Sequence, residues 1–191
     1  SGSVIKNNYV EGTVGWGGVM YHSGSGYNEV INNTFVNNGN HGGVEFYNGG
    51  DDSLIINNTF RSSKYGIEDY GTHNNMTVKG NIFTNQNTYD VYVKGNDWII
   101  LNNKFLDGGV TYYINDQGCS GCNYNNSNSG NYYADAANMD FTDSNSDGYA
   151  DGGANHPYSA ANGGKVNGAN VIDYFPAMHA DWDNFKNVNI F

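Results

Sequence analysis

Two glutamates recur at the same place in a repeated sequence pattern, and their carboxyl groups are suited to acid–base chemistry. Glu45 lies in the segment 43–46, and Glu68 lies in the matching segment 66–69. Glycoside cleavage uses two neighbouring carboxyl groups, one as an acid and one as a base or nucleophile. We expect an exposed polar face without catalysis, and a catalytic role for Glu45, Glu68 and Asp69 is the alternative interpretation.

An acidic loop is the second candidate site. Residues 143–151 read Asp-Ser-Asn-Ser-Asp-Gly-Tyr-Ala-Asp, which matches the D-x-N-x-D-G-x-x-D spacing of a calcium loop. In such loops alternate carboxylate and amide oxygens point to one centre, and the glycine allows a sharp turn. We expect a structural calcium ion here, and a hydrophilic turn without metal is the alternative. The predicted ligands are Asp143, Asn145, Asp147, Asp151 and the backbone carbonyl of Tyr149.

The only two cysteines, Cys119 and Cys122, form a C-x-x-C motif. Zinc would need two further ligands, and position 123 is not the histidine that c-type haem attachment requires. In an extracellular protein the expected state is a disulfide, either within the chain or between subunits. Asn75 and Asn125 begin N-x-S/T sequons in expected loops, so both are candidate glycan acceptors.

Three histidines, His22, His41 and His73, lie about one repeat apart but out of strict register. A metal site that they share is an alternative use of these side chains.

The elements that must position these residues belong to a repeat. An aliphatic residue, two variable residues, Asn, one variable residue and an aromatic residue recur five times between residues 4 and 105, at spacings of 26, 25, 23 and 22 residues. A period in this range indicates a solenoid, in which each coil buries its apolar face only by stacking on the next coil. The repeated segments are 4–9, 30–35, 55–60, 78–83 and 100–105.

A second row of β-prone segments lies between the first, at 18–21, 43–46, 66–69, 90–93 and 109–112. Two strand rows per coil predict an all-β, parallel β-helix of about five coils with an inter-coil spacing of about 4.8 Å. Asn tolerates the left-handed conformation, and its amide can bond to a like amide above and below. The predicted ladder contains Asn7, Asn33, Asn58, Asn81 and Asn103. The predicted aliphatic stack contains Val4, Val30, Ile55, Val78 and Ile100, and the aromatic stack contains Tyr9, Phe35, Phe60, Phe83 and Phe105.

The composition narrows the class of partner. The 191 residues carry a net charge of −11 with only eight Lys and Arg residues, which argues against nucleic acid and against a polyanionic substrate. No segment has the apolar length of a membrane span, and no signal peptide is recognisable.

The repeats divide the chain into two expected parts. Residues 1–114 form the coils, and residues 115–191 form a loop-rich C-terminal cap or appendage whose last stretch, 181–191, alternates like a strand. Only three residues precede Val4, so nothing local covers the first coil. We expect a second copy to complete it head to tail, and a shortened chain or a lid made by the C-terminal tail is the alternative.

Several blocks of the tail occur in a recognisable order. They are residues 130–135 (Gly-Asn-Tyr-Tyr-Ala-Asp), 142–151, 156–158 (His-Pro-Tyr) and 170–178. Together with the coil pattern, they resemble the right-handed parallel β-helix repeats of NosD-like and related carbohydrate-associated proteins, and the tails of archaeal, especially methanogen, surface proteins. Tyr133 stands where Trp is usual, and Ala177 stands where Leu is usual. The resemblance implies a right-handed helix in an exported, envelope-associated protein.

Two functions are expected from these features. The first is a structural protein outside the cell that assembles with copies of itself into a sheath, surface layer or filament, with Tyr47, Tyr92 and Tyr113 packing between subunits. The second is a β-helix that binds or cleaves carbohydrate through Glu45, Glu68 and surface aromatic residues.

Overall fold

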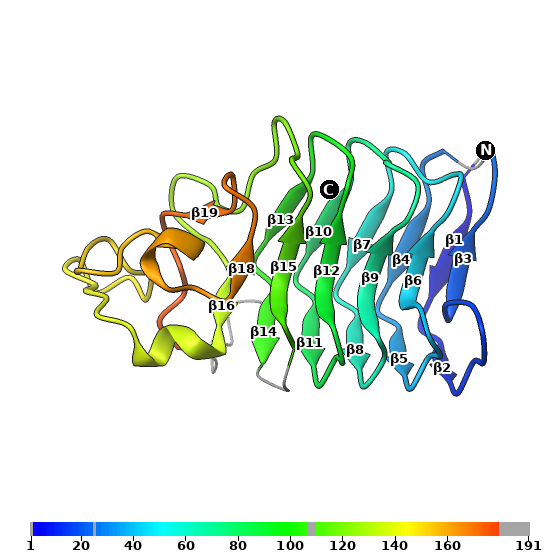
Figure 1. Ribbon diagram of the computed structural model, residues 1–191, viewed down its shortest axis with the longest axis horizontal. Helices are drawn as coiled ribbons and strands as arrows, with labels where there is room; N and C mark the ends of the chain where they lie inside the picture. Colours follow the sequence, from blue (N-terminus) through cyan, green and yellow to red (C-terminus); the bar gives the residue numbers. More distant parts are fainter. Residues whose placement is uncertain (1, 25, 107–109, 180–191) are drawn as a thin grey trace.

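The repeats form a parallel β-solenoid of about five coils, which confirms the predicted all-β fold. The structure is a computed structural model that describes residues 2–24, 26–106 and 110–179. Figure 1 shows the strands of successive coils side by side along the long axis, with the first coil at one end and the loop-rich C-terminal region at the other.

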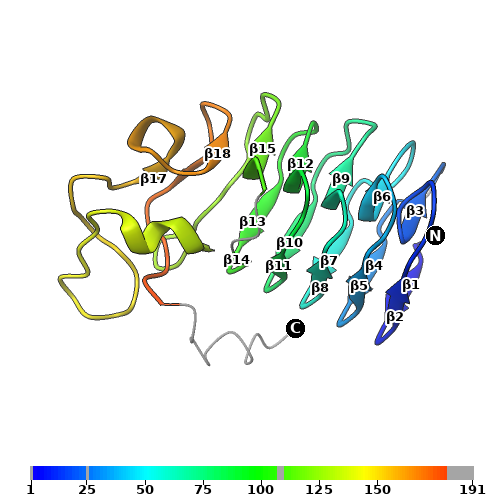
Figure 2. The ribbon, with the colours of Figure 1, turned by 60° about the horizontal axis from the view of Figure 1, so that its bottom comes forward.

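Each coil contributes one strand to each of three parallel sheets, which Figures 1 and 2 show from two directions. Sheet A contains β1 (Val4–Lys6), β4 (Glu29–Ile31), β7 (Leu54–Ile56), β10 (Thr77–Lys79) and β13 (Ile99–Leu101). Sheet B contains β2 (Tyr9–Glu11), β5 (Thr34–Val36), β8 (Thr59–Arg61), β11 (Ile82–Thr84), β14 (Lys104–Leu106) and β16 (Tyr132–Tyr133). Sheet C contains β3 (Val19–Tyr21), β6 (Gly42–Phe46), β9 (Tyr65–Asp69), β12 (Tyr89–Val93), β15 (Tyr112–Asp116) and β18 (Val166–Asn167).

The prediction of two strand rows per coil was therefore wrong, because the repeated Asn pair divides the first row into two short strands. The first residue of the pair has positive φ, which turns the chain between sheets A and B. Four coils use Asn there, at Asn7 (φ 60°), Asn32 (φ 55°), Asn57 (φ 56°) and Asn102 (φ 56°), and Gly80 (φ 67°) takes the place in the remaining coil.

The second Asn of the pair forms the ladder. Its side-chain oxygen accepts a hydrogen bond from the backbone N–H of the equivalent Asn in the preceding coil, for example Asn33 N to Asn58 Oδ1 at 2.8 Å. Its amide group donates to a backbone carbonyl of the preceding coil, as from Asn58 Nδ2 to Val30 O at 2.8 Å. The first residue of the pair thus makes the turn and the second forms the ladder, whereas the sequence pattern predicted that one Asn does both.

The register of the first coil differs by one residue from the prediction. Asn8, not Asn7, bonds to Asn33 in the ladder, with Asn8 N to Asn33 Oδ1 at 2.9 Å. Strand pairing places Ile5 beside Val30, so Val4 lies outside the aliphatic stack and its side chain is 65% exposed. Each position of this coil has a neighbour of similar type, so both registers satisfy the pattern.

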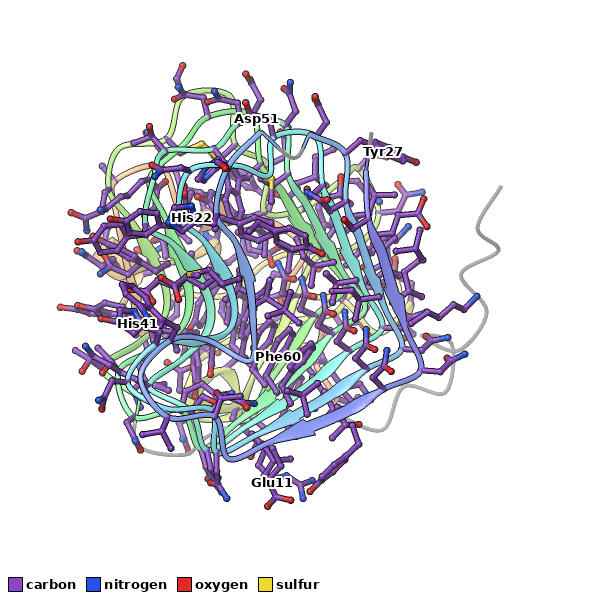
Figure 3. All side chains as sticks on the ribbon, turned by 90° about the vertical axis from the view of Figure 1, so that its right-hand side faces the viewer. Glu11, His22, Tyr27, His41, Asp51 and Phe60 are labelled. Carbon is purple, nitrogen blue, oxygen red and sulfur yellow. A yellow bond between two sulfur atoms is a disulfide. The ribbon has the colours of Figure 1, made fainter. Side chains whose placement is uncertain are left out.

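The aromatic stack runs through the interior of sheet B. Ring centroids are separated by 5.1 Å for Phe35–Phe60, 4.9 Å for Phe60–Phe83 and 5.2 Å for Phe83–Phe105, close to the expected inter-strand spacing. Tyr133 continues the stack, with its ring 5.3 Å from that of Phe105. In the view along the axis, Phe60 lies inside the coil (Figure 3).

Two further corrections concern the first position of the aromatic stack and the fifth strand of sheet C. Tyr9 was predicted in the stack, but Val10 pairs with Phe35 and Tyr9 is 64% exposed. In sheet C the fifth strand is four residues later than predicted, because Ile114 and not Val110 pairs with Val91.

The coil sheets continue beyond residue 114, since β16 pairs with β14 and β18 pairs with β15. The rest of the described tail contains the short 3-10 helices η1 (Ala134–Asn138) and η2 (Ala160–Asn162) and the antiparallel pair β17 (Tyr158–Ser159) and β19 (Ile172–Asp173). The strand expected at 181–191 lies outside the described residues. No helix in the described ranges has the length and apolar character needed to cross a membrane.

Candidate functional site

The outer side of sheet C carries three parallel columns of side chains, with one member from each of several successive coils. In Figure 3, which looks along the axis, the labelled His22 and His41 lie on the outer side of this sheet. We call this surface, together with Trp16 from the loop before β3, the aromatic face. Its ring-bearing residues are Trp16, His22, His41, Tyr47, Tyr65, Tyr70, Tyr89, Tyr92 and Tyr112.

The first column contains tyrosines at the start of three successive strands. Tyr65 pairs with Tyr89 and Tyr89 with Tyr112, and the ring centroids lie 5.6 and 6.0 Å apart. The Lys64 ammonium group lies 5.0 Å from the centre of the Tyr65 ring, a cation–π distance. This column is therefore a continuous stack of rings with a cation at one edge.

The second stack lies just beyond the strand ends. The His22 and Tyr47 rings are 5.2 Å apart, and the Tyr47 and Tyr70 rings are 5.0 Å apart and nearly parallel. Lys94 covers Tyr70 from the following coil, with Nζ 5.0 Å from the ring centre, and also lies 5.4 Å from the Tyr92 ring centre. Tyr70 nevertheless keeps 48% of its surface exposed.

The two predicted glutamates lie between these columns. Glu45 on β6 pairs directly with Glu68 on β9, so the coil register brings the two carboxyl groups together, as the repeat predicted. The pairing of Glu68 with Tyr92 continues the column. Glu45 is fully buried and Glu68 is only 4% exposed, and His41 contacts both carboxyl groups.

His41 joins both carboxyl groups. Its Nδ1 lies 3.0 Å from Glu68 Oε2 and 3.6 Å from Glu45 Oε1. The Trp16 ring stacks on the His41 ring at 5.2 Å, and the backbone N–H of Gly17 donates to Glu45 Oε2 at 3.1 Å. Burial raises the pKa of the Glu68 carboxyl, and the neighbouring His41 opposes that shift.

Asp69 does not join this group. Neighbouring residues on a strand point to opposite faces, so Asp69 points inward from β9 while Glu68 points outward. The Asp69 carboxylate accepts hydrogen bonds from the backbone N–H groups of His73, Lys94 and Gly95, and His73 Nδ1 lies 2.8 Å from its Oδ1. These contacts give Asp69 a structural role at the corner of the coil, which contradicts its place among the candidate catalytic residues.

The three histidines considered together as ligands are also separated. His22 stacks on Tyr47, His41 contacts the glutamates, and His73 bonds to Asp69. In the described part of the chain, one group of three or more potential ligands has all its ligand atoms within 4.8 Å of one another, namely His41, Glu45 and Glu68.

A polar hollow of about 460 Å³ opens beside the second stack. The chain segments that follow Tyr47 and Tyr70 form part of it, so the hollow and the aromatic face are adjacent. Its glycine-rich lining leaves backbone groups accessible between the loops. The lining residues are Gly24, Gly26, Asn48, Gly49, Gly50, Asp51, Gly71, Thr72 and His73.

The acidic loop 143–151 is closed by hydrogen bonds to its own backbone. Asp143 accepts from the N–H groups of Asp147 at 3.2 Å and Gly148 at 2.8 Å, and Asp147 accepts from Tyr149 N at 3.0 Å. Asp151 accepts from Ser144, and these hydrogen bonds lower the pKa of its carboxyl. Calcium binding by Asp143, Asn145, Asp147, Tyr149 and Asp151 stays a prediction.

The remaining predicted sites lie apart from the aromatic face. Cys119 and Cys122 form a disulfide within the chain. Asn75 is exposed and its amide donates to Asp52 Oδ1 at 3.0 Å, whereas Asn125 is half-buried and donates to the Asn126 carbonyl at 2.9 Å. Glycan attachment at either Asn stays a prediction.

Sequence reasoning missed Trp16, His41 and the two tyrosine stacks as parts of one surface. The signal was present in the tyrosines, because Tyr65, Tyr89 and Tyr112 are spaced at the coil period. Trp16 and His41 come from loops, where position in the repeat does not predict contact. Tyr47 and Tyr92 lie on the outer face as expected, but Tyr113 is fully buried, which corrects its assignment to a subunit contact.

Comparison with family models, with curated protein sequences and with solved structures found no match to this chain. The chain is therefore shown to be a parallel β-solenoid, and membership of a NosD-like family stays a prediction from the sequence.

Proposed function

We propose that this protein binds polysaccharide outside the cell, through the aromatic face of sheet C, without cleaving it. The observation that carries the proposal is the alignment of ring side chains from successive coils on one outer surface. A surface with a regular repeat along its axis suits a ligand that also repeats, and a polysaccharide chain is such a ligand.

The chemistry of the face fits sugar hydroxyls and C–H groups. Tyrosine and tryptophan combine a large apolar surface with a polar group that forms hydrogen bonds. Trp16, with 54% of its surface exposed, and Tyr70, with 48%, are exposed rings of the face. The net charge of −11 favours a neutral polysaccharide over an acidic one.

Binding is favoured over cleavage by the position of the glutamates. A catalytic carboxyl group must contact the glycosidic oxygen or the sugar carbon, but Glu45 is fully buried. The ligand atoms of Glu45 and Glu68 lie within 4.8 Å of each other and share His41. Inverting glycosidases separate their carboxyl groups by about 6.5–9.5 Å to admit water, so this spacing does not suit that mechanism. Retaining glycosidases bring the two groups to about 5–5.5 Å, but one of them must reach the sugar carbon, and the burial of Glu45 and Glu68 works against that contact.

Affinity for insoluble polysaccharides tests the proposal. Purified protein is incubated with cellulose, chitin or mannan, and the bound fraction is measured as a function of protein concentration. Replacing an exposed anchoring ring should weaken binding by about 10-fold, so Trp16→Ala and Tyr70→Ala should each shift the isotherm. Tyr9→Ala is the matched control, because Tyr9 is an exposed tyrosine on β2, outside sheet C. Equal binding by all three variants, or no retention of the wild-type protein, would contradict the proposal.

Self-assembly into a sheath, surface layer or filament is the second candidate. In the described structure β1, β2 and β3 are the outermost strands of their sheets, and an edge strand can pair with a further coil. Light scattering and negative-stain imaging over a range of concentrations separate the two functions. Polymers whose growth is blocked by a Pro substitution at Lys6, whose backbone N–H points away from β4, would support assembly, and a monomer at all concentrations would exclude it. The envelope location that the sequence blocks imply is compatible with either function.

A further inference from the structure

The cluster formed by His41, Glu45 and Glu68 combines one imidazole nitrogen with two carboxylate oxygens. The three side chains come from two adjacent coils: His41 and Glu45 from the loop before β6 and from β6 itself, and Glu68 from β9. All three ligand atoms lie within 4.8 Å of one another. Since Nδ1 of His41 is 3.0 Å from Glu68 and 3.6 Å from Glu45, the three donor atoms face one common space.

One atom of the cluster is not satisfied by the protein. Glu45 Oε2 accepts a hydrogen bond from Gly17 N, but Glu45 Oε1 is buried and has no hydrogen-bond partner. Leaving a buried acceptor unsatisfied costs about 1–3 kcal/mol, and more for a charged group. The residue itself is fully buried, so bulk solvent does not supply the missing partner. A bound cation between Oε1 and the other two ligand atoms would supply it.

We propose that His41 Nδ1, Glu45 Oε1 and Glu68 Oε2 bind a divalent first-row transition-metal ion, such as Zn²⁺. One imidazole nitrogen and two carboxylate oxygens make a ligand set that such ions accept, with a fourth position left for water or another oxygen. Calcium takes six to eight oxygen ligands, so a site with a nitrogen and two carboxylates suits it poorly. The proposal is independent of polysaccharide binding.

The surroundings hold the ligands in place. Trp16 stacks on the His41 ring, and the backbone N–H of Gly17 donates a hydrogen bond to the second oxygen of Glu45. A Cβ atom at Gly17 would lie 2.6 Å from the Gly42 carbonyl oxygen and 3.4 Å from Glu45 Oε2, so only glycine lets this loop approach the cluster so closely. The loop that carries Trp16 therefore supports two of the three proposed ligands without supplying a ligand itself.

Titration of the metal-free protein with Co²⁺, followed by visible absorption, and with Zn²⁺, followed by calorimetry, tests the site. We expect one ion per chain and an absorption band from bound Co²⁺. The variants His41→Gln, Glu45→Gln and Glu68→Gln should each lower the affinity by at least about 100-fold, since each removes a direct ligand. Glu45→Gln keeps the shape of the side chain and an oxygen for Gly17 N–H, and its circular dichroism spectrum verifies that it folds.

Two controls address the competing explanations. Glu11→Gln removes an exposed carboxylate elsewhere and should leave metal affinity unchanged, and so should Asp143→Asn in the acidic loop. Overturning results are the absence of Zn²⁺ and Co²⁺ binding by the wild-type protein, unchanged affinity in Glu45→Gln, or loss of binding in Asp143→Asn. In the first case the contact of His41 Nδ1 with Glu68 Oε2, at 3.0 Å, holds the cluster together without a metal.

Discussion

Asn58 shows how a single side chain joins three coils. Its amide donates to Val30 O in the preceding coil at 2.8 Å and to Asn81 Oδ1 in the following coil at 3.0 Å. Its oxygen accepts from the backbone and side chain of Asn33, at 2.8 and 3.1 Å. Because Asn58 is only 1% exposed, water cannot replace these partners.

Removing this amide should therefore strongly destabilise the protein. Asn58→Ala leaves several buried donors and acceptors without partners, and we expect the free energy of unfolding to fall by about 3 kcal/mol or more. Urea denaturation followed by circular dichroism measures the change. Asn87→Ala, at an exposed asparagine, should change stability by less than about 0.5 kcal/mol. A similar small effect at both positions would mean that the ladder does not stabilise the coils.

The preceding residue, Asn57, is expected to tolerate different substitutions. Its φ of 56° lies in the left-handed region, which β-branched residues rarely adopt. Asn57→Val should lower the unfolding free energy by about 1–3 kcal/mol, whereas Asn57→Gly should be nearly neutral, because Gly80 occupies the same corner one coil later. The order of thermal midpoints, wild type and Gly above Val, checks this, and the reverse order would contradict the assigned turn.

At the scale of elements, the described C-terminal region is held by contacts between its separate sequence blocks. Asn131 N donates to Asp173 Oδ2 at 2.7 Å, and the Tyr133 and Tyr158 rings stack at 3.8 Å. The Tyr158 hydroxyl donates to Asp135 Oδ1 at 2.8 Å. These contacts join residues far apart in the tail, so the tail closes as one unit over the last strands of the solenoid.

The stability of this region should depend on the protonation of Asp173. Burial raises the pKa of its carboxyl to about 7, against hydrogen bonds from Asn131 and Phe175 that lower it. In the unfolded chain the pKa is about 3.9. Between these values the folded state holds a proton that the unfolded state lacks, so the free energy of unfolding decreases as pH rises from about 4 to about 7. The full effect is on the order of 4 kcal/mol.

Denaturation at several pH values measures this dependence. Asp173→Asn cannot ionise, so its stability should change less over this pH window than that of the wild-type protein, even though its absolute stability differs. Asp140→Asn, at an exposed carboxylate, is expected to keep the wild-type slope. Parallel pH profiles for the wild type and Asp173→Asn would show that Asp173 is ionised throughout.

Calcium binding by the acidic loop is tested at the same scale. If Asp143 and its neighbours bind calcium, excess Ca²⁺ at 100 times the dissociation constant should stabilise the protein by about 2.7 kcal/mol and raise its melting temperature. Asp143→Asn should weaken this response, and chelation should reverse it in the wild type. An unchanged melting temperature in millimolar Ca²⁺ would indicate a hydrophilic turn.

The strands that the sequence predicted correctly are those whose side chains are all constrained by stacking. Phe60 and Phe83 occupy one column because each coil needs a ring of the same size at the same place. In the first coil the repeat pattern does not determine the register. Asn7 and Asn8 both fit the Asn position, and Val4 and Ile5 both fit the aliphatic position. The one-residue error there follows from this ambiguity.

The candidate site was predictable in part for the same reason. Register placed Glu45 beside Glu68, but adjacency in sequence wrongly grouped Asp69 with them, since consecutive strand residues face opposite sides. Trp16 and His41 arrive from loops, whose paths depend on packing with other coils rather than on a repeated local pattern. The contacts that complete the site are therefore the ones that the repeat does not encode.

For the molecule as a whole, the described solenoid is a row of units in which each coil bonds to its neighbours. Differences in repeat length are absorbed by the loops, since the paired strands of sheets A and B keep three residues in every coil from β1 to β14. The stability of such an array is approximately the sum of unit and interface contributions.

Residues with positive φ turn the chain shortly before the strands of sheet A. Asp52 (φ 60°) and Asn75 (φ 59°) turn the chain alike, one coil apart, so the segment 53–75 begins and ends at equivalent joints. A tandem duplication of that segment would insert one complete coil with the same backbone turn at both ends, and it would lengthen the aromatic face by one coil. If the aromatic face binds a polysaccharide, each duplication would lengthen the contacted stretch of polymer by one coil. The length of the binding surface would then be set by the number of coils, without redesign of any contact.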